Sequence, residues 1–114
     1  MTDINKERWK TLIKFMERQF GEGLEFEGIL LLIGMQELGK GYRKLNKDEK
    51  MDVMNIAVCK ILELKGYYRY SGKDSDDWPH WEPVTPLPYM KKAEQDDFLK
   101  IAVIEYFESI NDKP

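Results

Sequence analysis

Residues 46–70, NKDEKMDVMNIAVCKILELKGYYRY, decide much of the fold. Asn46 and Glu49 have the spacing of a capping box, in which side chains and backbone amides exchange hydrogen bonds at the start of a helix. Apolar side chains then recur along one helical face, at Met51, Met54, Val58, Ile61 and Leu62. Gly66 ends the pattern, because glycine readily takes the left-handed conformation found after helices. The stretch predicts a helix from Lys47 to about Lys65.

A second helix is expected just upstream, from about Leu24 to Leu38. Its centre, Ile29–Ile33, is apolar on every side, so periodicity alone leaves a buried strand open. The length of the segment and its flanking Glu and Gln residues favour a helix that is largely surrounded by others. Gly28 and Gly34 lower the intrinsic stability of such a helix, and we interpret them as points where a neighbouring backbone comes close.

Two more helices are expected towards the ends of the chain. Asp3–Phe20 carries one apolar stripe, with Thr2 or Asp3 available as the N-cap and Gly21 as the stop. The last helix begins between Pro88 and Ala93 and ends near Ile110. Because the connections between the first three helices are short, neighbouring helices should run antiparallel. The sequence predicts a single all-α domain over residues 1–114, built as a four-helix bundle.

The segment Tyr67–Pro88, between the third and fourth helices, is unusually long and rich in proline and aromatic residues. Loops of more than about 12–15 residues are uncommon in compact domains and are usually functional or disordered, and the aromatic content here argues against disorder. Residues 71–90 carry one Lys against three Asp and one Glu, so this segment alone has a net charge of −3. Inside it, Tyr67–Tyr70 could pair with Trp81–Val84 as a short hairpin, an alternative that the sequence leaves open.

Composition excludes several classes of protein. The chain has 114 residues, of which 42% are hydrophobic and 34% charged, as in an ordinary globular protein. The net charge of −3 disfavours a general nucleic-acid binder. No apolar run approaches the ~20 residues of a membrane span, so no membrane association is expected. One cysteine, Cys59, excludes an intrachain disulfide, and the N-terminus lacks a secretory signal, so we expect a cytoplasmic protein.

Metal and catalytic sites are not expected. Five side chains of the acidic segment could supply ligands: Asp74, Asp76, Asp77, His80 and Glu82. Their spacing is not that of a calcium loop, and one histidine with one cysteine is too few for zinc. The expected helices carry no Glu-x-x-His pair, and the chain has no phosphate-binding glycine loop and no nucleophile–histidine motif. We therefore predict no cofactor and no catalytic residue.

Two short resemblances point to known families. The pairs Glu22-x-x-Glu25 and Glu49-x-x-Asp52 resemble those of the MazG-like nucleotide pyrophosphatases, which hold magnesium between helices. Both pairs lie near the starts of successive helices, which antiparallel packing separates by roughly 20 Å at 1.5 Å per residue. Acids that complement the helix dipole are the simpler interpretation. Residues 62–69 resemble the end of a recognition helix leading into the wing of a winged-helix DNA binder, but the acidic charge opposes phosphate contact.

The sequence therefore predicts a protein–protein interaction or adaptor module. Trp and Tyr supply large, rigid contact areas, so the binding residues are expected among Tyr67, Tyr70, Asp76, Asp77, Trp78, His80, Trp81 and Glu82. The same aromatic residues could instead only cover the open end of the bundle. The partner could be another protein or a second copy, since apolar residues such as Phe15, Phe98 and Ile101 extend beyond a single stripe.

An alternative from another class stays open. It is a small-molecule-binding protein or hydrolase with its site at residues 67–88. His80 would then act as acid or base, oriented by a neighbouring carboxylate.

Overall fold

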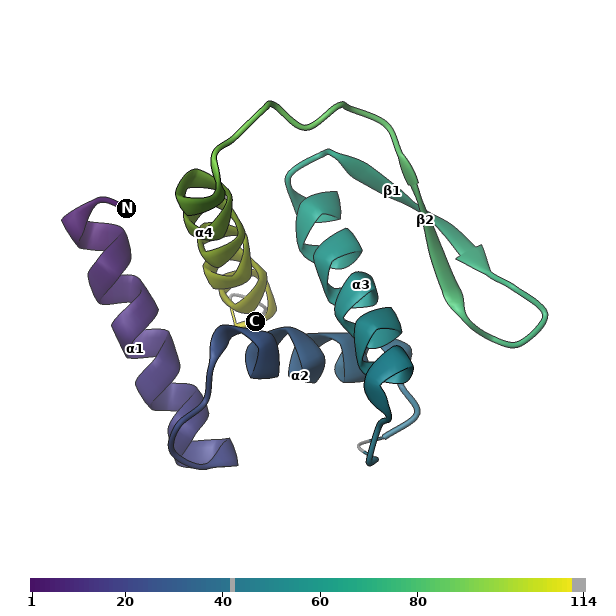
Figure 1. The fold of residues 1–114 in the computed structure, drawn as a ribbon, viewed down its shortest axis with the longest axis horizontal. Helices are drawn as coiled ribbons and strands as arrows, with labels where there is room; N and C mark the ends of the chain where they lie inside the picture. The colour runs from purple at the N-terminus through teal and green to yellow at the C-terminus, as the bar shows by residue number, and fades with distance from the viewer. Residues whose placement is uncertain (42, 112–114) are drawn as a thin grey trace. The chain divides into compact units, whose positions relative to one another are not determined.

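The computed structural model of the protein describes residues 1–41 and 43–111. In chain order its elements are α1 (Asp3–Phe20), α2 (Phe26–Leu38), α3 (Lys47–Leu64), β1 (Tyr68–Lys73), β2 (Pro79–Pro83) and α4 (Lys92–Asn111), as Figure 1 shows. The chain divides into two compact units: unit 1 is Met1–Phe26 with Pro88–Pro114, and unit 2 is Glu27–Leu87. The prediction of a single domain over residues 1–114 stays a prediction.

The fold is mainly helical, with one small antiparallel sheet in the described part of the chain. The predicted helical class and the four helices are therefore confirmed, but the fold is not a purely all-α four-helix bundle, because it includes this sheet. The reason is local: residues 68–83 pair with one another as strands, and the long crossover thereby satisfies its own backbone hydrogen bonds.

In unit 2, α2 and α3 approach each other closely at Gly34. A Cβ atom at Gly34 would lie 2.1 Å from the carbonyl oxygen of Val53, nearer than any real contact allows. The backbone approach expected at this glycine is therefore confirmed. Ile29–Ile33 belongs to α2, so the choice left open for that segment resolves as helix. The capping box at the start of α3 is also present, with Asn46 accepting from the Glu49 amide.

The core of unit 2 gathers side chains from both helices, their connection and the hairpin. Met35, Leu38, Leu45, Val53 and Ile56 are buried together, with Leu31, Trp78 and Trp81 packed against them. The two tryptophans of the hairpin thus complete a core that the helices begin. This packing anchors the hairpin, because a two-stranded sheet is marginally stable by itself.

The hairpin extends from the C-terminal end of α3 (Figure 1). β1 and β2 pair antiparallel, with Tyr70 opposite Trp81, and a bulge interrupts the register between Tyr70 and Gly72. The register of this pairing agrees with the one that the sequence suggests. The observed strands are longer, since their pairing continues to Lys73 and Pro79. β2 begins and ends with proline, which an edge strand tolerates because it leaves amides unpaired.

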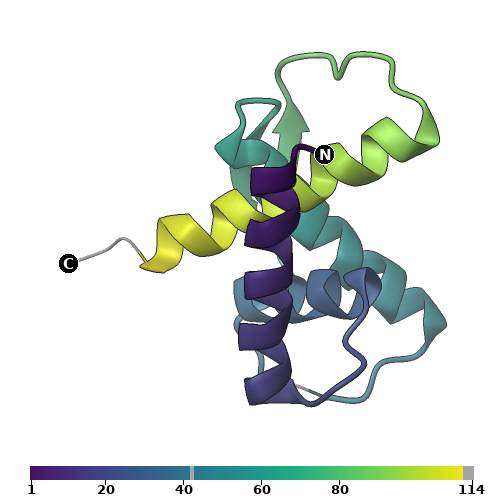
Figure 2. The ribbon, with the colours of Figure 1, turned by 90° about the vertical axis from the view of Figure 1, so that its left-hand side faces the viewer.

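In unit 1, α1 packs against α4, and the two helices cross (Figure 2). α1 begins as expected, with the Thr2 side chain accepting a hydrogen bond from the Asn5 amide at 3.2 Å. The Lys100 ammonium lies 5.5 Å from the centroid of the Trp9 ring, and Arg8 pairs with Glu108. These contacts join residues about 90–100 positions apart, so no local pattern could have indicated them.

None of the helices in residues 1–41 and 43–111 combines the length and the apolar character that crossing a membrane requires.

Candidate functional site

The hairpin sorts the predicted binding residues onto two faces. Successive side chains of a strand point to opposite sides, so Trp81 in β2 lies on the face turned to α3 while His80 and Glu82 lie on the other. Trp81 is half-buried, whereas His80 and Glu82 are exposed. These three predicted residues therefore lie on opposite faces of the hairpin.

The face turned to α3 holds a small pocket of about 220 Å³. The rings of Tyr70 and Trp81 meet edge to face in it, with centroids 5.3 Å apart. The Trp81 Nε1 donates a hydrogen bond of 2.7 Å to Oε1 of Glu63. The remaining lining residues are Glu37, Lys60, Lys73 and Pro79. Sequence reasoning missed the contributions of Glu37, Lys60 and Glu63, because these residues come from α2 and α3.

The charges of this pocket largely satisfy one another. The Lys60 ammonium lies 3.8 Å from a carboxylate oxygen of Glu37 and 3.8 Å from one of Glu63. Glu63 also accepts the Trp81 hydrogen bond. The pocket thus offers two acids and two lysines, with the acids already engaged. Such an arrangement holds the hairpin on α3 and leaves little polar capacity for a ligand.

His80 lies at the outer side of the hairpin tip, where its Nε2 is 2.7 Å from Oδ2 of Asp74. Oδ1 of Asp74 also accepts hydrogen bonds from the amides of Asp76 and Trp78. The hydrogen bond with His80, followed by the one from the Trp78 amide, holds the pKa of the Asp74 carboxyl below its ordinary value. The His80 side chain is 54% exposed and does not line the pocket beside α3.

The other predicted residues serve the hairpin itself. Arg69 and Glu82 form an ion pair of 2.7 Å across the strands, and Lys73 lies 3.5 Å from Asp77. Asp77 has a φ of +65°, which the turn at the tip requires. Trp78 packs on the core of unit 2. Tyr67, just before β1, pairs through its carbonyl with the amide of Val84.

Carboxylate, histidine and cysteine side chains do not gather in threes anywhere in the part of the chain that the structure describes. Asp74 and His80 are brought together, but Asp76 and Asp77 contribute a backbone amide and a lysine contact to the turn instead.

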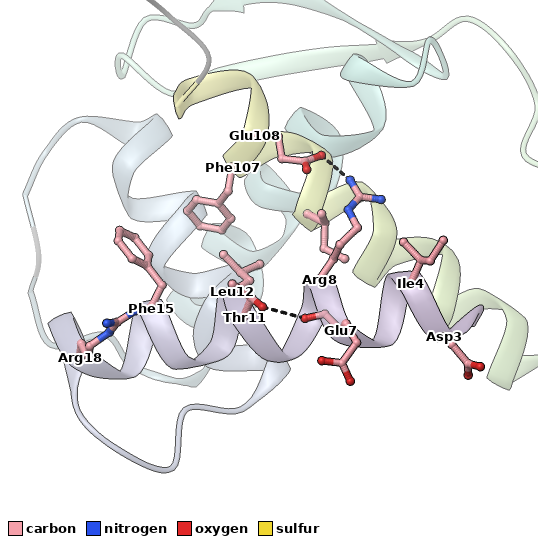
Figure 3. A pocket seen from close by; sticks show the side chains of 11 residues that line it. Asp3, Ile4, Glu7, Arg8, Thr11, Leu12, Phe15, Arg18, Phe107 and Glu108 are labelled. Atoms are coloured by element: carbon pink, nitrogen blue, oxygen red, sulfur yellow. Dashed lines mark hydrogen bonds and ion pairs between the residues drawn. The ribbon is translucent and has the colours of Figure 1, made fainter.

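A larger hollow lies in unit 1, between α1 and α4. It is a groove of about 730 Å³, shown in Figure 3, and we call it the α1/α4 groove. Its apolar lining comes from both helices: Ile4, Leu12, Phe15, Ile104 and Phe107. Ile4 is 74% exposed and Phe15 is 41% exposed, which is unusual for such large apolar side chains on one patch. The groove therefore presents a continuous apolar surface.

Charged residues rim this apolar surface. Asp3 and Glu7 lie towards the N-terminal end of α1, and Arg18 lies at the opposite end (Figure 3). Arg8 spans the groove to pair with Glu108 on α4. An apolar floor with a polar rim is typical of a protein-docking surface.

The sequence carried a partial signal for this groove. Phe15 is off the stripe of α1 and was expected at an interaction face, and it does line the groove. Phe98 and Ile101, expected at such a face as well, are half-buried and do not line it. Ile4 carried the same signal as Phe15, because the two lie on one side of the helix. The α4 contribution depends on how α4 crosses α1, which no pattern in the sequence reveals.

No protein-family model, curated protein or solved structure matches this chain.

Proposed function

We propose that this protein is a protein-interaction module that binds an apolar helix of its partner in the α1/α4 groove. The observation that carries the proposal is the groove itself: about 730 Å³, with a floor of large apolar side chains and a charged rim. Amphipathic helices commonly dock in grooves of this kind, placing apolar residues at helical spacing against the floor.

The energetic argument rests on Ile4 and Phe15. Burying a large apolar side chain completely contributes about 1.5–3 kcal/mol, in proportion to the area removed from water. Ile4, at 74% exposed, has most of that area still available, and Phe15 has less than half. A partner helix that covers both side chains removes this apolar area from water, and the burial contributes favourable free energy to binding.

The hairpin supports the alternative, a small-molecule binder or hydrolase, less well. Its pocket of about 220 Å³ is below the ~300–1,000 Å³ of ordinary ligand sites. The acids in it already pair with Lys60. The aromatic face of the hairpin therefore serves better as a structural cover than as the primary binding surface.

The proposal includes a cytoplasmic location without nucleic-acid or membrane partners. A single cysteine suits a reducing compartment. The hairpin, with four carboxylates against Arg69 and Lys73, suits a protein partner better than phosphates.

A display experiment tests the function. Helical peptides are selected from a displayed amphipathic library on the immobilised protein, and their affinities are then measured for Ile4→Glu and Phe15→Glu. Each substitution should weaken binding by about tenfold or more, because it places a charge on the apolar floor. Met51→Glu is the matched control, since Met51 is 65% exposed on α3 and lies outside the groove. Selected peptides that bind Ile4→Glu and the original protein equally would contradict the proposal.

A further inference from the structure

The rim of the α1/α4 groove carries charges in a particular order along α1. Asp3 and Glu7 line its N-terminal half and Arg18 its C-terminal half, and Lys14 lies on α1 beside the groove rather than in its lining. At about 100° per residue, these four residues fall within an arc of roughly 60°. The arc borders Ile4, Thr11 and Phe15, so along this edge of α1 the acidic residues come first and the basic residues last.

These charges are available for an intermolecular contact. All four side chains are exposed. Within residues 1–41 and 43–111, Asp3, Lys14 and Arg18 form no ion pair. Glu7 lies 3.6 Å from Lys10, in a pair so exposed that it constrains the carboxylate little.

In an antiparallel pair of α1 helices, this order of charges places the acidic residues of each copy opposite the basic residues of the other. Asp3 pairs with Arg18 and Glu7 pairs with Lys14 if two copies of α1 run antiparallel. The midpoints of both pairs fall between residues 10 and 11. The apolar pair Ile4 and Phe15 has its midpoint between residues 9 and 10, within one position of the same centre. The charge pairs and the apolar pair therefore belong to antiparallel registers that differ by two residues, about 3 Å along the helix, which the long Lys, Arg and Glu side chains span.

We propose that the occupant of the α1/α4 groove is a second copy of this chain, with α1 packed antiparallel on α1 about a two-fold axis near Lys10. The inference rests on the proposed function, because it uses the same groove. A two-fold contact repeats each interaction, so Ile4 covers Phe15 twice and the Asp3–Arg18 pair forms at both ends. A parallel arrangement would instead bring like charges together along the whole helix, which disfavours it.

Charge reversal tests this register. Asp3→Arg and Arg18→Asp are made singly, and the self-association of each is measured by sedimentation equilibrium at low salt. The original chain should approach twice its 13.5 kDa with rising concentration. Each single variant should associate about tenfold more weakly or worse, because its rim then carries one sign of charge at both ends.

An equimolar mixture of the two variants provides the decisive measurement. Mixed pairs bring opposite charges together at both ends, so the mixture should recover association to within about threefold of the original dissociation constant. Lys6→Asp is the matched control: it makes the same change of charge as Arg18→Asp on an exposed part of α1 outside the groove. It should leave the dissociation constant unchanged. Circular dichroism of each variant verifies that α1 is still helical.

The outcomes separate the two proposals. A single-chain mass at every concentration, or a dimer whose mixed variants show no recovery, would overturn the antiparallel dimer. If selected peptides still bind the original chain and lose affinity for Ile4→Glu, only the identity of the occupant is wrong. If the peptides do not distinguish Ile4→Glu and the chain is monomeric, the groove itself is not a docking surface.

Discussion

Asp74 organises the tip of the hairpin through its carboxylate. One oxygen accepts hydrogen bonds from the amides of Asp76 and Trp78, and the other lies 2.7 Å from His80 Nε2. The carbonyl of Asp74 also accepts from the Asp77 amide, which closes the turn. These bonds orient Trp78 towards the core of unit 2, so a single exposed acid connects the turn to the packing beneath it.

The stability of the hairpin tip should depend on pH through Asp74. Its pKa is lowered in the folded protein, chiefly by the hydrogen bond with His80, so the ionised carboxylate favours the folded tip. This contribution is complete above the ordinary carboxyl pKa, about 4, and is lost as the pH falls through the lowered value. Trp78 and Trp81 fluorescence should therefore report loosening of the tip at acidic pH.

Asp74→Asn should remove that dependence, because an amide accepts the same backbone hydrogen bonds without titrating. Asp76→Asn is the control, since only the backbone amide of Asp76 contacts Asp74. An acid transition of equal size in Asp74→Asn and in the original chain would refute the role assigned to this carboxylate.

Cys59 should behave as a buried apolar residue. It is 9% exposed within α3, and burial raises the pKa of its thiol. The thiolate is the reactive form, so modification by a thiol reagent at pH 8 should be about a hundredfold slower in the native protein than in denaturant. Equal rates under the two conditions would show that α3 opens readily at this position.

At the scale of elements, the contact between α2 and α3 depends on one missing side chain. Gly34 allows the Val53 backbone to lie where a Cβ atom would be. Glycine lowers helix stability by about 1 kcal/mol relative to alanine, so α2 carries an intrinsic cost here. The close approach of the two helices compensates for it through the packing of the surrounding core.

Gly34→Ala should destabilise the protein although alanine is the better helix former. Its methyl group would meet the Val53 carbonyl oxygen at 2.1 Å and the Val53 Cγ1 at 2.6 Å, so backbone has to move. We expect a net loss of about 1–3 kcal/mol in the free energy of unfolding, measured by urea denaturation. Gln36→Ala, on an exposed position of the same helix, should change it by less than about 0.5 kcal/mol. A neutral or stabilising Gly34→Ala would mean that the helices separate easily.

The start of a helix was predictable where a single capping residue marks it in the sequence. Thr2 and Asn46 cap α1 and α3 as expected, because capping uses neighbouring backbone amides. The hairpin was harder to delimit. Its bulge between Tyr70 and Gly72 and its turn at residues 74–78 arise from hydrogen bonds that close only when the strands are paired.

At the scale of the whole molecule, the two candidate surfaces differ in what they leave unsatisfied. The hairpin pocket in unit 2 pairs its acids with Lys60 and Trp81. The α1/α4 groove in unit 1 leaves Ile4 and Phe15 in contact with water. Burial of exposed apolar surface drives association. A partner therefore gains the most binding free energy at the groove.

Thermal stability should therefore depend on protein concentration. If the native chain dimerises through α1, mass action raises the Tm as the concentration rises, because only folded chains associate. Arg18→Asp should begin to show this rise in Tm only at a concentration about tenfold higher or more, while Lys6→Asp should follow the original chain. Differential scanning calorimetry over about a hundredfold in concentration distinguishes the two behaviours. A Tm of the original chain that does not change with concentration would contradict the dimer.

The sequence by itself placed the four helical segments and the caps of α1 and α3, and offered the hairpin as a possible pairing, because those features depend on residues close to one another along the chain. It also indicated Phe15 as a residue outside the apolar stripe. Only the tertiary structure decided which aromatic residues pack in the core and which apolar surface stays exposed to solvent. The physical reason is that the α1/α4 groove and the Lys60–Glu63–Trp81 cluster join residues from separate elements, and their proximity follows from packing rather than from spacing along the chain.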